Sequence, residues 1–261
     1  MNTKEVKIEK GTVYLETTIP QDEVDTVREH VVDEMIQEVT VKGFRQGKAP
    51  KSIAAGQLDP NKLSNHVLSH LFNDIITEAI KEHHYQLLGR PVLENIDTPK
   101  EGGWKIKLQL PIYPEVILGN YQKNIPKTDA AQEEEDKLEA IYRSLLESVS
   151  VEISPLLIDE EVNHSLERLE AQAKSLNLSS EDYLKAIKRD LASVKKEYAT
   201  RAEESIKLDL ILLEIAKKEN INTDDQELLA LAKLSNIPEN QLGQLKSILN
   251  RRKTVDYLLK I

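Results

Sequence analysis

The sequence has 261 residues, of which 39% are hydrophobic, 31% are charged and only 4% are aromatic, a balance typical of long solvated helices. The formal net charge of −10 excludes a general nucleic-acid coat, because phosphate binding requires a basic face. The absence of cysteine excludes disulfides and thiolate metal sites, and we expect a cytoplasmic protein, because no apolar run of about 18 residues suggests a membrane span or signal peptide.

The first part of the chain alternates between apolar and polar residues as a strand does. This alternation over residues 13–19 predicts a half-buried strand, and residues 6–8 predict a shorter partner strand. The apolar spacing then changes to three or four, which predicts one helix over 21–38 and a second through 63–79.

Two further strands are predicted after the second helix. Residues 92–96 form a short apolar run, and residues 104–112 alternate cleanly, which is typical of a strand with one solvated face. Together these elements predict an α+β domain over residues 1–118, made of an antiparallel sheet with two helices.

Strand alternation disappears after about residue 116. We expect a linker over residues 119–136, which ends in the acidic run 133–136, more typical of a solvated face than of a cation site. Residues 137–261 are then predicted to form an all-α, extended domain with helical arms.

The helical half carries its own start and stop signals. Residues 162–176 repeat apolar side chains with alternating spacings of four and three, as in the seam of an antiparallel helix pair. Ser179 and Asp182 form a capping box that predicts one long helix through residues 187–213. Other start or break signals lie at Thr223, Pro238 and Gly243.

A basic loop lies between the two N-terminal helices. Four lysines or arginines and no acidic residue fall between Val39 and Leu58, in a chain that is net acidic. Gly43 and Gly47 allow backbone angles closed to other residues, and Pro50 fixes the direction of the exit. We expect a docking loop formed by Lys42, Gly43, Phe44, Arg45, Gln46, Gly47, Lys48 and Pro50.

Two interpretations of this loop are open from its residues alone. In the first, Phe44 enters an apolar pocket of a partner while the cations meet phosphate groups. In the second, the segment is an ordinary glycine-rich loop, and Phe44 packs inward against the domain.

The sequence Gly-Phe-Arg-x-Gly-Lys-x-Pro, which spans residues 43–50, resembles the signature of the trigger factor family. Members of this family are chaperones at the exit tunnel of the large ribosomal subunit. The resemblance includes the turn Thr18–Pro20 and the segment Tyr113–Val116, and it covers residues 1–118.

The resemblance implies that Phe44 and Arg45 form the loop tip and contact a ribosomal protein and rRNA. The family usually has Lys at the third tip position, where this chain has Gln46. Losing one cation predicts weaker and more salt-sensitive docking, which neighbouring lysines such as Lys42 and Lys48 would partly offset.

The helical half resembles the C-terminal domain of the same family in the segments Val151–Glu161 and Glu197–Asn220. Many members insert an FK506-binding-type prolyl isomerase domain between the two halves. Its pocket is rich in aromatics, whereas this chain has only two Phe and one Trp, all before residue 118. Too few residues lie between Glu115 and Val151 for that domain, so the resemblance implies a short form without isomerase activity.

The implied function is that of an ATP-independent chaperone that binds the large ribosomal subunit and nascent or unfolded polypeptides, with no cofactor and no membrane. The alternative is a ribosome-independent holdase or assembly chaperone, and a homodimer off the ribosome is one form that it could take. The candidate client-binding residues are Tyr198, Leu212, Leu213, Leu229 and Leu231.

An enzyme or a metal protein is the less favoured interpretation. His66, His70 and Asp74 share one helix face, but such sets are usually solvated, and we expect no metal. No nucleotide-binding or hydrolase motif occurs in the sequence.

Overall fold

The computed structural model describes residues 2–99, 103–126 and 134–261, which fall into two units, Met1–Tyr113 and Pro114–Ile261. Residues 114–118, expected in the first domain, therefore belong to the second unit. Part of the expected linker, residues 127–133, lies outside the described residues. Its beginning is structured, because Tyr121 is helical and buried in the second unit's core.

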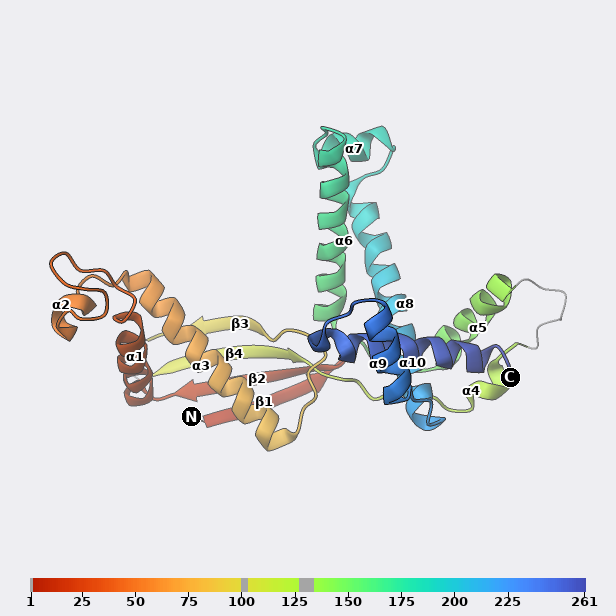
Figure 1. Ribbon diagram of the computed structural model, residues 1–261, viewed down its shortest axis with the longest axis horizontal. Coiled ribbons are helices and arrows are strands. Elements are labelled where there is room, and N and C mark those ends of the chain that lie inside the picture. The colour runs from red at the N-terminus through yellow and green to blue at the C-terminus, as the bar shows by residue number, and fades with distance from the viewer. Residues whose placement is uncertain (1, 100–102, 127–133) are drawn as a thin grey trace. The chain divides into compact units, whose positions relative to one another are not determined.

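The first unit is a four-stranded antiparallel sheet with order β1-β2-β4-β3 and helices on one face (Figure 1). Its elements in chain order are β1 (Asn2–Glu9), β2 (Thr12–Ile19), α1 (Gln21–Met35), α2 (Lys51–Ala55), α3 (Pro60–His83), β3 (Val92–Asp97) and β4 (Trp104–Pro111). The predicted strands and long helices are present, and α2 is an additional short helix. Helix α1 ends three residues before the expected end, because residues 36–38 form tight turns.

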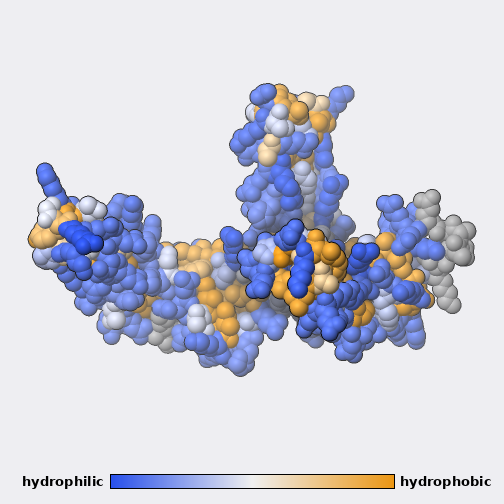
Figure 2. Space-filling view, in the orientation of Figure 1, coloured by the Kyte–Doolittle hydropathy of each residue, from blue (hydrophilic) through white to orange (hydrophobic). Residues whose placement is uncertain are grey.

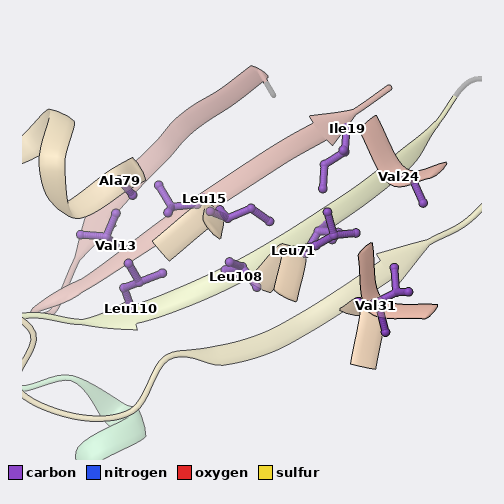
Figure 3. Packing of buried hydrophobic residues seen from close by; sticks show 12 residues of the cluster. Val13, Leu15, Ile19, Val24, Val31, Leu71, Ala79, Leu108 and Leu110 are labelled. Carbon is purple, nitrogen blue, oxygen red and sulfur yellow. The ribbon is translucent and has the colours of Figure 1, made fainter. Parts of the chain in front are cut away.

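The core of the first unit follows the two sequence periods. Along β2 the inward side chains, Val13 to Ile19 in steps of two, are buried, and their outward neighbours are half-buried. Along α3 the buried residues Val67, Leu71, Ile75 and Ala79 recur every four positions, so they form one stripe against the sheet. Figure 3 shows Leu71 and Ala79 among the strand side chains.

The second unit is helical in its described residues, apart from an isolated bridge between Ile117 and Ser150. Its helices are α4 (Tyr121–Asn124), α5 (Glu134–Ser148), α6 (Pro155–Ser175), α7 (Ser180–Ala186), α8 (Leu191–Lys218), α9 (Asp225–Leu234), the 3-10 turn η1 (Glu239–Gln241) and α10 (Leu242–Leu258). A core around Leu145, Ile211 and Ile215 joins α5, α8 and α10. None of the helices that the structure describes is both long and apolar enough to cross a membrane.

The single long helix expected after Ser179 is in fact two helices. Ser179 caps the short α7, and Lys188 then adopts a left-handed conformation with φ of 56° that ends it. Asp190 starts α8 by accepting a 2.8 Å hydrogen bond from the Ser193 amide. The helical spacing of apolar residues continues across the break between α7 and α8. This spacing alone therefore does not reveal the break.

Two other sequence signals in the helical half do not have the expected effect. Thr223 does not cap a helix: it is buried, and its amide and hydroxyl both donate to Asn250 Oδ1, at 2.7 and 2.8 Å. Gly243 does not break the last helix, because it lies in the first turn of the 17-residue α10. A glycine lowers helix stability by only about 1 kcal/mol, which packing of α10 against α8 offsets.

Candidate functional site

The basic loop joins α1 to α2 and is built from two tight turns. The amide of Phe44 donates to the carbonyl of Val41 at 3.0 Å, and the amide of Lys48 donates to the carbonyl of Arg45 at 2.9 Å. The third residue of each turn is a glycine with positive φ, 92° at Gly43 and 71° at Gly47, as type II turns require. Phe44 and Arg45 therefore lie between two turns of defined shape.

The second turn is also held against the turns at residues 36–38 that follow α1. The Gln46 side chain donates a 3.0 Å hydrogen bond to the carbonyl of Glu38. A Cβ at Gly47 would lie 3.0 Å from the carbonyl oxygen of Gln37, whereas a Cβ at Gly43 would meet nothing within 4 Å. A larger residue at position 47 is thus disfavoured both by the left-handed backbone conformation and by contact with Gln37. At position 43 only the backbone conformation disfavours it.

We expect Gly47→Ala to lower the free energy of unfolding of the first unit by about 1–2 kcal/mol, because alanine is strained at this φ and also crowds Gln37. Gly43→Ala is the control that carries the backbone cost without the contact. Urea unfolding followed by the fluorescence of Trp104, the single tryptophan, measures both. If the free energy of unfolding falls equally in the two variants, the contact with Gln37 does not contribute to the loss.

The loop leaves an aromatic ring and several cations exposed. Phe44 is 43% exposed, which disfavours the interpretation in which this ring packs inward. In the described structure, Lys42, Arg45 and Lys48 form no ion pair, whereas Lys51 is bound to Asp33 of α1 at 2.5 Å. The loop therefore presents one apolar ring and three free cations.

Helix α2, which the sequence did not predict, directly follows the loop. Ala54 is buried and anchors the helix, while Ile53 is 44% exposed. The signal in the sequence was Pro50, which directly precedes the helix and has the fixed φ that suits a helix start. Two exposed apolar side chains, Phe44 of the loop and Ile53 of α2, thus lie within ten residues of each other in the sequence.

The candidate client-binding residues differ in what they expose. Leu212 is 1% exposed and lies in the core with Ile211 and Ile215, so its expected role on the surface is wrong. Leu213 and Leu229 are exposed. The other two, Tyr198 and Leu231, are half-buried.

Tyr198 lines a groove between α6 and α8. The groove has a volume of about 380 Å³, and its walls include Arg168 and Arg201. Both arginines are paired with acidic side chains of their own unit, Arg168 with Glu161 at 2.9 Å and Arg201 with Glu197 at 2.6 Å. The groove is therefore polar and internally neutralised, and it offers a client little apolar surface.

Of the three residues His66, His70 and Asp74 on α3, His70 contacts helix α1, whereas His66 and Asp74 are exposed. His70 Nε2 lies 3.2 Å from a carboxylate oxygen of Glu34 on α1, and its ring meets His30 edge-on at a centroid distance of 5.8 Å. Among the described residues, no group of three or more potential ligands is arranged to hold a metal ion.

Comparison with known families matches both halves of the chain. A family model described as "Bacterial trigger factor protein (TF)" matches residues 1–145, and one described as "Bacterial trigger factor protein (TF) C-terminus" matches residues 119–260. The two matches overlap, which leaves no residues between them for a middle prolyl isomerase domain.

Individual relatives agree with these matches. The chain is 31% identical to the trigger factor of Carboxydothermus hydrogenoformans over 138 residues, which are 48% of this chain and 32% of that protein. It is 25% identical to the trigger factor of Limosilactobacillus reuteri over 252 residues, which are 90% of this chain and 55% of that protein. The chain thus spans between about a third and about half of these relatives.

A solved structure, described as "Promiscuous Substrate Recognition in Folding and Assembly Activities of the Trigger Factor Chaperone", resembles this chain with a TM-score of 0.73. The match covers 100% of this chain and 99% of that one, at 15% identity. At this identity the likeness establishes a common fold.

Proposed function

The chain belongs to the bacterial trigger factor family, and on that premise we propose that it is an ATP-independent chaperone that docks at the ribosomal tunnel exit through its basic loop. In this proposal the helical unit shields emerging polypeptides, and the chain has no isomerase activity. Both family matches support the proposal, because together they leave no room for an isomerase domain.

The observation that carries the proposal is the exposed pair Phe44 and Arg45 between two fixed turns. A rigid loop loses little conformational entropy when it binds, so a small contact can still be specific. The ring suits an apolar pocket of a protein, and the free cations suit the phosphates of rRNA. A tunnel exit presents both kinds of surface side by side.

The helical unit supplies the surface for clients in this proposal. Leu213 and Leu229 are exposed, and Leu234 is 80% exposed on the same helix as Leu229. Figure 2 shows hydrophobic side chains gathered over the region of α9. Docking of the loop would raise the local concentration of this surface near an emerging chain. Shallow apolar binding is reversible, so a client leaves when its own core forms, without nucleotide.

Co-sedimentation of the chain with vacant large ribosomal subunits, at low and at moderate salt, tests the proposal. If Lys42, Arg45 and Lys48 each meet one phosphate, raising the salt from about 50 to about 200 mM lowers the affinity about 20- to 40-fold. Absence of binding at both salt concentrations would reject docking and favour the ribosome-independent holdase.

We expect Gln46→Lys to tighten docking several-fold at low salt, because it restores a fourth free cation. The slope of log affinity against log salt should steepen by about 0.7–0.9. The change costs little stability, since the hydrogen bond of Gln46 to the Glu38 carbonyl is exposed. The same sedimentation assay measures it, and an unchanged affinity and slope would show that the loop is not the docking tip.

A further inference from the structure

The last turn of α1 carries two adjacent carboxylates, Asp33 and Glu34, shortly before the basic loop. Neither position favours a negative charge on local grounds. The carboxyl end of a helix is the negative end of its dipole, and this last turn contains no basic residue. A carboxylate beside a loop that binds phosphate also weakens that binding. The reason for the two carboxylates must therefore lie in their contacts with other elements.

The two carboxylates contact different helices of the first unit. One oxygen of Glu34 lies 3.2 Å from Nε2 of His70 on α3, and the other lies 3.2 Å from Nε2 of His30, one turn earlier on α1. An oxygen of Asp33 lies 2.5 Å from the ammonium nitrogen of Lys51, the first residue of α2. Glu34 thus joins α1 to α3, and Asp33 joins α1 to α2.

The ion pair between Asp33 and Lys51 closes the basic loop at its base. Residues 36–50 connect α1 to α2 and include this loop, so the two charged side chains lie at its entry and its exit. Inside the loop, the other side-chain restraint is the hydrogen bond from Gln46 to the Glu38 carbonyl. Holding the two ends of a segment together reduces the number of conformations that the segment can adopt.

The strength of this ion pair suits a role in shaping the loop. The side chains of Lys51 and Asp33 are 56% and 54% exposed, so water and salt screen the attraction. An exposed pair of this kind changes an equilibrium by a factor of about five at most. The pair therefore adds little to the stability of the whole unit, whereas the same factor is large for a loop that opens and closes on its own.

We propose that Asp33 and Lys51 are positioning residues for docking: their ion pair holds the basic loop in the shape that binds, and Lys51 makes no phosphate contact. The inference rests on the proposed docking function and adds two residues that control it. When the pair is lost, only the fraction of chains with a closed loop binds, and the apparent affinity falls in proportion. Charge alone predicts the opposite for Asp33, because neutralising it removes a repulsive group and frees a cation.

Two variants with opposite changes in charge test the proposal. Asp33→Asn and Lys51→Met should each lower the affinity for vacant large ribosomal subunits about two- to fivefold, measured by co-sedimentation over a range of subunit concentrations at low salt. The double variant should bind about as well as either single variant, because one pair can be lost only once. If Asp33→Asn binds as tightly as the unmodified chain, or more tightly, the proposal is wrong.

The salt dependence separates positioning from direct contact. In Lys51→Met the slope of log affinity against log salt should stay the same, whereas loss of a phosphate contact would make it shallower by about 0.7–0.9. A slope that is shallower by this amount would show that Lys51 itself meets a phosphate and would overturn the proposal. Lys51→Arg keeps the charge that pairs with Asp33 and should dock as the unmodified chain does.

Glu29→Gln is the matched control for Asp33→Asn. Glu29 is an exposed residue of α1, one turn before Asp33, and the substitution removes the same charge from the same helix. Its affinity for the subunits should not fall. A loss equal to that of Asp33→Asn would mean that the ion pair with Lys51 is not responsible.

Hydrogen exchange on the free chain separates this inference from the proposed function. The amides of Phe44 and Lys48 close the two turns of the loop, so their exchange rates report its opening. We expect both amides to exchange about two- to fivefold faster in Asp33→Asn, while the amides of α3 keep their rates. Unchanged rates at Phe44 and Lys48 would overturn the positioning role and leave the docking function intact. If the unmodified chain does not bind the subunits, the docking function itself fails, and this inference fails with it.

Discussion

Replacing Phe44 and Arg45 together by alanine is expected to lower the affinity of the chain for large ribosomal subunits by at least about 100-fold, so that it no longer co-sediments with them. Large aromatic and arginine side chains at the centre of an interface each contribute about 2 kcal/mol or more, and about 1.4 kcal/mol corresponds to a factor of ten. The loop backbone should survive, because its hydrogen bonds come from main-chain groups and from Gln46.

The matched control changes an exposed arginine and an exposed valine of the same unit, Arg90→Ala/Val92→Ala, at the start of β3. It removes the same kinds of group far along the sequence from the loop, and its binding should equal that of the unmodified chain. Binding that persists when Phe44 and Arg45 are lost, or that falls equally in the control, would place the contact elsewhere.

The second large effect concerns the core of the first unit. Leu71→Ala is expected to lower the free energy of unfolding of that unit by about 2–5 kcal/mol, because Leu71 is fully buried between α3 and the sheet. The loss combines the transfer free energy of the removed atoms with the cavity that they leave. Urea unfolding monitored by Trp104 fluorescence measures the change, since this side chain packs against the same core.

Ile215→Ala is the comparison for Leu71→Ala. Ile215 is equally buried but lies in the core of the second unit, which contains no residue of the first. Its loss should destabilise the second unit and leave the Trp104 transition near its original midpoint, while helical circular dichroism falls earlier in urea. A shift of the Trp104 transition as large as that of Leu71→Ala would mean that the two cores unfold together.

The strands and the two long helices of the first unit could be predicted from its sequence, whereas helix α2 and the order of the strands could not. The strand pattern of residues 13–19 and the four-residue spacing from Val67 to Ala79 each match one buried face, because only one side of each element meets the core. The turns of the basic loop were also identifiable, since Gly43 and Gly47 occur where turns need positive φ.

The sequence could not say which apolar residues of the helical half are buried. Leu210, Ile211 and Leu212 are all buried, because α8 is contacted by α5, α6 and α10 rather than on one face. Ile187 and Leu191 continue the same apolar pattern, yet they are exposed, because they lie at the turn between α7 and α8. The apolar spacing in the sequence shows which side chains are apolar. The number of helices packed around each segment decides which of them are buried.

The sequence by itself therefore determined the family, the α+β and helical halves and the residues of the basic loop, because these depend on local spacing and on short-range backbone constraints. Only the tertiary structure decided that Phe44 is exposed while Leu212 is buried, and that Lys51 is paired while Lys42, Arg45 and Lys48 are free among the described residues. Exposure and pairing depend on groups that are distant in the chain, and those groups come together only when the chain folds.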